Sequence, residues 1–310
     1  MTVRPVKRYR DYNNYLREIF GERVQKISLD AGMGCPNRDG ILSRQGCIFC
    51  NGRGSGTGAL SNHGISIKDQ IVKAGGHLRS RYKAGKFIAY FQSFSNTYAS
   101  LPRLESLYDE ALAQHDIVGL SVATRPDCVD SGVLRLLGSY EQDFLVWIEY
   151  GLQSAHDQTL KRINRGHDVA CFERSVLMAR EYGLNICVHI ILGLPGETRE
   201  MMLETAGFLS QLPIQGVKIH LLYVVEGTYL AELFKKGTFR CLEREEYSEL
   251  VVDFLELLPP HMVIQRLTGD PAKYELVAPS WATEKSKNLN NIRDTLESRD
   301  TWQGRLFKTC

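Results

Sequence analysis

Short apolar runs rich in β-branched residues recur along the chain and alternate with segments of helical periodicity. The six runs are VQKISLD (24–30), KFIAYFQ (86–92), IVGLSVAT (117–124), FLVWIEYG (144–151), NICVHIILG (185–193) and GVKIHLLYV (216–224). Apolar residues three or four positions apart predict helices at 101–115, 131–142, 169–183 and 198–212. Strands that are apolar throughout and alternate with helices are typical of a parallel sheet covered by helices.

Six such units are fewer than the eight of a complete barrel. We therefore expect an α/β fold with a partial (βα)6 barrel, whose active site lies at the carboxyl ends of the strands. The expected divisions are an N-terminal helical lead-in at 1–22, the partial barrel at 23–230 and a small α+β C-terminal extension at 231–310. Within the extension, the pattern predicts helices at 243–258 and 283–299 and a strand at 263–269.

Composition places the chain among folded, soluble proteins. A chain of 310 residues with 43% hydrophobic content can bury a large core, which argues against disorder. No apolar run approaches the roughly 18 residues of a membrane-spanning helix, and the basic first ten residues lack the apolar stretch of a signal peptide. We expect a cytoplasmic protein that does not bind a membrane.

Three of the eight cysteines, Cys35, Cys47 and Cys50, share one polar loop after the first predicted strand, with the spacing C-x11-C-x2-C. A structural zinc would need a fourth ligand, for instance His63. Three thiolates on a 4Fe-4S cluster would instead leave one iron open to a substrate or cofactor. The residues alone leave both alternatives open. The glycine-rich segment 51–58 lacks the Lys-Ser/Thr pair of a P-loop and indicates a flexible loop.

Several further motifs occur in a fixed order around this loop. They are Phe49 beside the last two cysteines, TRPD (124–127), EYGLQS (149–154), NRGH (164–167), GLPGET (193–198) and EGTYL (226–230). Together they resemble the radical S-adenosylmethionine (radical SAM) enzymes, and more narrowly the branch with the catalytic subunit of Elongator and the oxygen-independent coproporphyrinogen oxidases. The whole chain looks most like a bacterial family of stand-alone radical SAM proteins of about 310 residues.

This resemblance implies a function. One branch of that family removes the carboxymethyl group from 5-carboxymethylaminomethyl-uridine at the wobble position of tRNA. A small-molecule substrate such as a porphyrin precursor is the alternative within the same chemistry, and a zinc-stabilised binding module is the non-enzymatic alternative. The radical SAM resemblance also implies an external electron donor.

The resemblance implies two cofactors as well. A 4Fe-4S cluster would be held by Cys35, Cys47 and Cys50, and its fourth iron would bind S-adenosyl-L-methionine. Reductive cleavage of that cofactor gives a 5'-deoxyadenosyl radical, which abstracts hydrogen from the substrate. The protein would position the reactants and exclude competing reactions.

The S-adenosylmethionine contacts implied by the resemblance lie at the strand ends. They are Phe49, Gln92, Ser93, Ser95, Asn96, Arg125, Glu149, Gln153, Ser154, His189, Leu194, Pro195 and Gly196. Glu149 should point to the same side of its strand as Gly151. Arg125 suits a carboxylate, with an ion pair to Asp127 as the alternative. His189 is otherwise a core residue with its hydrogen bonds satisfied.

A basic stretch at 70–86 contains no acidic residue. Its cations are Lys73, Arg79, Arg81, Lys83 and Lys86. Given the resemblance, we expect these side chains, together with the basic residues of segments 4–10 and 161–165, to contact tRNA phosphates. The alternative is a solvated face.

Overall fold

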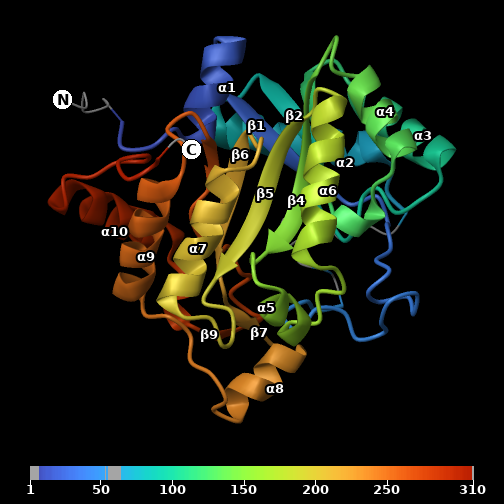
Figure 1. Cartoon of the computed structure of the whole chain (residues 1–310). Coiled ribbons are helices and arrows are strands. Elements are labelled where there is room, and N and C mark those ends of the chain that lie inside the picture. Colours follow the sequence, from blue (N-terminus) through green and yellow to red (C-terminus); the bar gives the residue numbers. More distant parts are fainter. Residues whose placement is uncertain (1–6, 53, 55–63, 309–310) are drawn as a thin grey trace.

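Seven parallel strands form one curled sheet in the computed structural model, which describes residues 7–52, 54 and 64–308 (Figure 1). Across the sheet they are β1 (Val24–Leu29), β2 (Lys86–Phe91), β3 (Ile117–Thr124), β4 (Leu145–Gln153), β5 (Asn185–Leu192), β6 (Gly216–Leu221) and β8 (Val263–Arg266). Each strand pairs with its neighbour in parallel. The predicted α/β partial barrel is confirmed.

Helices cover the convex face of the sheet (Figure 1). Following β1 to β5 in turn are α2 (Ile67–Tyr82), α3 (Leu101–Leu112), α4 (Ser131–Ser139), α6 (Val169–Glu181) and α7 (Arg199–Ser210). An outer layer is formed by α9 (Arg244–Leu257), which packs against both α7 and α10 (Lys285–Ser298). The short helices are α5 (Asp157–Arg162), α8 (Tyr229–Lys235) and two 3-10 turns at Pro126–Cys128 and Ser280–Thr283.

The main core lies between the sheet and these helices. It contains apolar side chains from all seven strands of the sheet. Within it, Phe172 of α6 packs edge-on against Tyr150 of β4, with ring centroids 6.3 Å apart. N-cap side chains fix where helices begin: Asp168 accepts a hydrogen bond from the backbone N–H of Cys171, which starts α6. The helices are thereby held at defined positions over the strand ends.

The amino-terminal end of the barrel is covered by α1 (Tyr12–Phe20). Tyr12 and Tyr15 pack edge-on against the buried Trp147 of β4, with centroid distances of 6.0 and 5.8 Å. Just before α1, the backbone N–H of Ile264 in β8 donates to the carbonyl of Arg10 at 2.8 Å. The N-terminal segment therefore lies along the outer edge of β8.

The observed elements differ from the predicted ones in several places. The short helices α5 and α8 were not predicted. The helix α2, which carries the basic stretch, was not predicted. The strand expected at 216–224 ends at Leu221, and the next residues form β7 (Val224–Val225), antiparallel to β9 (Leu276–Ala278). The strand expected in the C-terminal extension is β8, and it pairs with β6 rather than staying outside the barrel sheet. The expected division into three segments stays a prediction.

Some sequence predictions concern residues outside the described ranges. These are the candidate zinc ligand His63, most of the glycine-rich segment 51–58, and the basic residue Arg4. In the part of the chain that is described, no helix is long and apolar enough to cross a membrane.

Candidate active site

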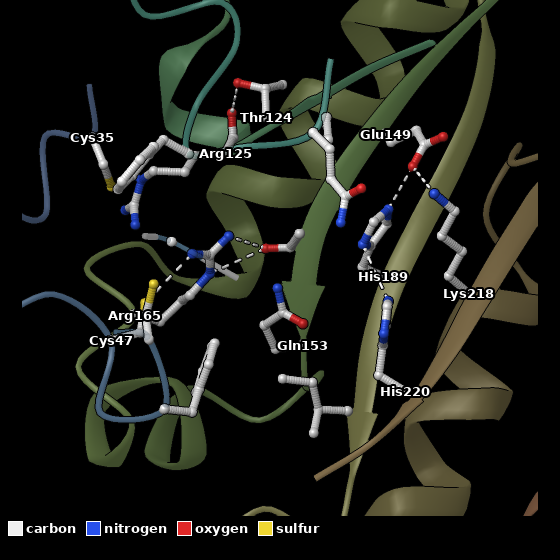
Figure 2. A pocket seen from close by; sticks show the side chains of 18 of the residues that line it. Cys35, Cys47, Thr124, Arg125, Glu149, Gln153, Arg165, His189, Lys218 and His220 are labelled. Carbon is white, nitrogen blue, oxygen red and sulfur yellow. Dashed lines mark hydrogen bonds and ion pairs between the residues drawn. The ribbon is translucent and has the colours of Figure 1, made fainter. Parts of the chain in front are cut away.

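A pocket opens at the carboxyl ends of the strands, and β2 to β6 and β8 all contribute side chains to it (Figure 2). On one side lie Cys35 and Cys47 of the loop that follows β1. On the other side lies a group of polar side chains from the middle of the strands, which we call the charged wall: Glu149, His189, Lys218, His220 and Arg266. The pocket therefore has two chemically different sides.

The cysteine loop brings Cys35, Cys47 and Cys50 to the same side of the pocket. Cys47 is buried, and the other two are half-buried. Ile48 anchors the loop, because its backbone N–H donates to the carbonyl of Ile163 at 3.1 Å and its carbonyl accepts from the N–H of Leu230 at 2.9 Å. The loop is thus tied to the ends of α5 and α8.

Nitrogen donors surround the Cys47 sulfur. Arg165 Nη1 lies 3.5 Å from Sγ and Asn37 Nδ2 lies 3.6 Å from it. Arg165 is held by hydrogen bonds from Nε and Nη2 to the carbonyl of Gly151, at 3.1 and 2.5 Å. A Cβ at Gly151 would lie 2.6 Å from Arg165 Nη2, so a glycine is needed for this approach. N–H donors of this kind stabilise thiolate and cluster sulfur.

The spacing of the three thiols bears on which metal they suit. A tetrahedral zinc with bonds of 2.3 Å brings its sulfur ligands to about 3.8 Å from one another. Among the described residues, Glu149, Cys187 and His189 are the one group whose ligand atoms all lie within 4.8 Å, and the loop cysteines are not such a group. Thiols that converge more widely fit a cluster of several irons better than one zinc ion.

The chemistry of the thiols also suits a metal centre. Burial raises the pKa of Cys50 to about 12, and Cys47 adds to this effect, so this thiol stays protonated near neutral pH without a metal. Binding to a metal centre deprotonates such a thiol. At Glu149, by contrast, Lys26 and Lys218 already supply the positive charge, so that group needs no metal ion.

The segment after β2 contributes Gln92 to the pocket, and Ser28 Oγ donates to its Oε1 at 3.0 Å. Phe94, at φ 63°, also lines the pocket and was missed by the sequence. The predicted Ser93, Ser95 and Asn96 are buried behind this lining. Ser95 Oγ lies 3.1 Å from Thr124 Oγ1, and Asn96 Nδ2 donates to the carbonyl of Ala123 at 2.9 Å.

Arg125 pairs with Asp127 and keeps one guanidinium nitrogen without a hydrogen-bond partner among the described residues. Its Nε and Nη2 donate to both carboxylate oxygens of Asp127 at 2.8 and 2.7 Å, so the alternative ion pair is formed. Burial lowers the pKa of Arg125, but the bonds to Asp127 outweigh it and hold the side chain charged. Nη1 is buried without a hydrogen-bond partner among the described residues, and Arg125 lines the pocket. An orphaned donor at this place fits an anionic cofactor group.

Glu149 accepts hydrogen bonds from several side chains of the charged wall and its surroundings (Figure 2). It is fully buried and accepts from Lys26 Nζ at 2.5 Å, from Lys218 Nζ, and from His189 Nε2 at 2.7 Å. Burial raises the pKa of Glu149, but Lys218 and Lys26 outweigh this and hold it well below its usual value. Donors from the protein's own side chains therefore use the hydrogen-bond acceptor positions of this carboxylate.

The histidines extend this network. His189 Nδ1 lies 3.3 Å from His220 Nε2, with ring centroids 5.1 Å apart. Burial lowers the pKa of His189 to about 4, with Lys218 adding to the effect. Burial and the neighbouring His189 lower the pKa of His220 well below its usual value. Both rings are thus neutral near pH 7.

The remaining predicted contacts divide between the pocket and its surroundings. Phe49 and Gln153 line the pocket, and Gln153 has φ 82° at an irregularity in β4. Ser154 instead donates to the Glu197 carboxylate, and Pro195 accepts from Arg162 Nη1 at 3.0 Å through its carbonyl. Leu194 and Gly196 do not line the pocket. Leu194 packs in the small apolar cluster around Ile48, and Gly196 lies next to Arg162.

Four basic side chains on the strands that face the interior were not predicted: Lys26, Lys218, His220 and Arg266. A signal was present, because Lys218 and His220 are two apart in the otherwise apolar strand GVKIHL. Lysine inside an apolar strand needs a buried counter-ion, and Glu149 is the acidic residue in a central strand.

Comparison with known protein families identifies two regions of similarity. The Radical SAM superfamily model matches residues 32–209, and the Radical_SAM C-terminal domain model matches residues 214–298. The first match contains the cysteine loop, and the second contains β8. Both sides of the pocket thus fall within the matched regions.

Relatives and solved structures agree with these matches. The Uncharacterized protein YtqA of Bacillus subtilis is 41% identical over 302 residues, which cover 97% of this chain and 94% of that protein. A tRNA uridine(34) acetyltransferase of Dehalococcoides mccartyi is 33% identical over 193 residues, 60% of this chain and 40% of that protein. The structure of Methanocaldococcus infernus Elp3 has a TM-score of 0.68 at 17% identity, and covers 90% of this chain and 64% of that one, which shows a shared fold.

Proposed function

Because this chain belongs to the radical SAM superfamily, we propose that it modifies tRNA, by removing the carboxymethyl group from 5-carboxymethylaminomethyl-uridine at the wobble position. The chain is an enzyme, because it belongs to a superfamily of radical SAM enzymes. The substrate is the proposed part. A similarity over 60% of this chain to an enzyme named for uridine 34 of tRNA is the observation that carries it.

Members of the superfamily bind a 4Fe-4S cluster and S-adenosylmethionine. Cys35, Cys47 and Cys50 would hold the cluster, with the N–H groups of Arg165 and Asn37 directed at sulfur. When bound, these cofactors supply a carbon-centred radical that abstracts hydrogen from the substrate. The chain's own part is to bind the methionyl carboxylate near the free Nη1 of Arg125 and to shield the reaction from water.

The basic stretch predicted to bind tRNA lies at the other end of the sheet. Lys86 is the first residue of β2, whereas the pocket lies at the carboxyl ends of the strands. Arg79 pairs with Asp116, and Lys86 pairs with Glu22 at 3.1 Å. This leaves Lys73, Arg81 and Lys83, which are exposed on or just after α2, as proposed phosphate contacts. A tRNA that used them would bind along the side of the barrel.

The proposed activity can be tested on purified components. Protein reconstituted anaerobically with iron and sulfide is given S-adenosylmethionine, a reductant and tRNA that carries 5-carboxymethylaminomethyl-uridine. Mass spectrometry of the nucleosides should show conversion to 5-aminomethyl-uridine, because only the carboxymethyl group is lost. Cys47→Ala should abolish conversion, since it removes an expected cluster ligand.

The matched control is Cys171→Ala on the outer helix α6, which should convert tRNA like the wild type. Cofactor cleavage without any change in the tRNA nucleosides would reject the tRNA substrate and favour a small molecule. Undiminished conversion by Cys47→Ala would reject the assignment of the cysteine loop.

A further inference from the structure

Cations outnumber acids among the side chains that line the pocket. The described part of the lining contains one carboxylate, Glu149, and five cationic side chains: Arg38, Arg125, Arg165, Lys218 and Arg266. Arg125 and Arg165 lie on the side of the cysteines (Figure 2), where Arg125 pairs with Asp127 and Arg165 lies beside Cys47 and the expected cluster. Lys218 and Arg266 belong to the charged wall, and Glu149 neutralises one positive charge there. The wall keeps an excess of positive charge.

Arg266 is the source of this excess. It lies directly opposite Lys218 in the register of β6 and β8, so both side chains leave the sheet on the same face. The guanidinium is half-buried and has no hydrogen-bond or ion-pair partner within the described ranges. A charge withdrawn from water needs a partner, and the planar fork of arginine matches a carboxylate.

His220 offers a complementary group. The Glu149 carboxylate can only accept hydrogen bonds, so His189 must carry its proton on Nε2. Nδ1 of neutral His189 then accepts, and His220 must donate to it from Nε2. Nδ1 of neutral His220 is left as a hydrogen-bond acceptor, and in the described structure no group donates to it.

We propose that the charged wall recognises the carboxymethylamino side chain of the modified uridine, with Arg266 binding its carboxylate and Nδ1 of His220 accepting a hydrogen bond from its amine. This inference rests on the proposed function, and it names the chemical group of the substrate that the charged wall binds. A carboxymethylamino group carries an N–H donor and a carboxylate separated by one carbon, which matches an acceptor and a cation on neighbouring strands.

Lys218 supports the same assignment. Its ammonium donates to Glu149 and, at 2.9 Å, to the hydroxyl of Tyr90. Burial lowers the pKa of Lys218 to about 7, so near that pH part of the protein carries the ammonium form, whose third N–H remains for a ligand in the pocket that Lys218 lines. The carboxylate bound by Arg266 can accept it.

Binding to holoenzyme without reductant tests this recognition separately from turnover. Protein with its cluster and S-adenosylmethionine is titrated, by fluorescence anisotropy, with anticodon stem-loops carrying 5-carboxymethylaminomethyl-uridine, 5-aminomethyl-uridine or uridine. Wild-type protein should prefer the first loop to the second by about tenfold to a hundredfold, the range for a charge-assisted bidentate contact. Arg266→Gln should lose this preference while its affinity for the second loop stays unchanged.

The matched control is Arg180→Gln on the exposed face of α6, which should keep the wild-type preference. Arg266→Lys retains the charge but not the fork, and should show an intermediate preference even if Arg266→Gln folds poorly. A wild-type preference that persists in both Arg266 variants overturns the inference. Wild type that converts tRNA but shows no preference also overturns it, with the proposed function intact. Wild type that neither converts nor discriminates rejects the proposed function itself.

The contribution of His220 is measured separately, as the ratio of the affinities for the 5-aminomethyl-uridine loop and the uridine loop, which differ in the amine. His220→Gln keeps an amide donor near Nε2 but lacks the Nδ1 acceptor, and should lower this preference. His220→Asn places an amide oxygen near Nδ1 and should restore part of it. Equal preferences in wild type and His220→Gln would remove His220 from the recognition.

Discussion

At the scale of single residues, Glu149 organises the interior of the barrel. Its carboxylate lies on β4 and binds lysines from β1 and β6, strands separated by most of the sheet. Both lysines reach one acid only because the sheet curls. Buried charges persist in proteins when they are paired in this way, so this network ties the curl to charge compensation.

Glu149→Gln should therefore be strongly destabilising. It leaves Lys26 and Lys218 near each other without a counter-charge, and breaking a buried pair in this way costs about 3–5 kcal/mol of unfolding free energy. Urea denaturation at pH 7 measures the loss. The double variant Glu149→Gln/Lys218→Met should lose less than the single variant, because it removes one of the stranded charges.

The control is Glu181→Gln, on the exposed end of α6, which should change stability by less than about 0.5 kcal/mol. A Glu149→Gln variant as stable as this control would show that the lysines have another way of losing their charge.

The sequence predicted part of this site. The spacing of Cys35, Cys47 and Cys50 was informative because all three lie in one loop, and the structure brings them to one side of the pocket. The position of Arg266 could not be predicted for a physical reason. Residues 263–266 enter the sheet only through their pairing with β6, which is a tertiary contact that the local pattern does not contain. The roles of the predicted site residues stay predictions.

At the scale of elements, apolar runs predicted the parallel strands well because each strand is buried on both sides. Helix α2 escaped prediction since its buried face combines Ile67 and Ile71 with Gln70 and Gly75, which interrupt the apolar spacing. Gly75 faces Ile27 of β1, where a Cβ would lie 3.7 Å away. The pairing of β7 with β9 joins segments about 50 residues apart, which no local pattern reveals.

The anchoring of the cysteine loop by Ile48 gives a prediction for this element. Ile48 is 7% exposed and packs with Leu160 and Leu194, so Ile48→Ala leaves a cavity beside the loop. We expect the variant to lose iron faster than wild type after anaerobic reconstitution, when a chelator is added. Iron content against time and the thermal melting curve measure the two effects.

Ile41→Ala is the matched control, since Ile41 lies on the same loop and is 73% exposed. It should retain iron like the wild type. If Ile48→Ala also retains iron at the wild-type rate, the apolar cluster does not hold the loop in place.

At the scale of the whole molecule, the buried histidines predict how stability depends on pH. Burial lowers the pKa of His189 to about 4, whereas an unfolded histidine titrates near 6.5. Between these values the unfolded chain binds more protons, so the folded state loses stability as the pH falls through this window. The slope approaches about 1.4 kcal/mol per pH unit for each proton taken up.

Denaturation of metal-free protein at several pH values between 4 and 7 measures this slope. The variant His189→Gln/His220→Gln should show a flatter dependence, because two groups with lowered pKa values are gone. His115→Gln, at a side chain 98% exposed, should leave the slope unchanged. A slope that is equal in the double variant and in wild type would contradict the prediction.

The overall architecture followed from the repeated strand and helix units, except at one edge. Residues 263–266 read as part of an extension because a long helical segment separates them from β6. Packing of α9 over α7 returns the chain to the sheet, so that β8 can pair with β6. Such a return depends on tertiary contacts and not on local sequence.

The segment along β8 has a consequence for how the protein behaves in solution. An unpaired strand edge is a template on which other chains can add strands and aggregate. Here the carbonyl of Arg10 takes up the N–H of Ile264, and Gln303 holds the same segment through the backbone N–H of Arg10 at 3.0 Å. Residues 7–11 therefore cover part of the β8 edge, and a fusion that pulls them away would expose a strand edge on which other chains could pair.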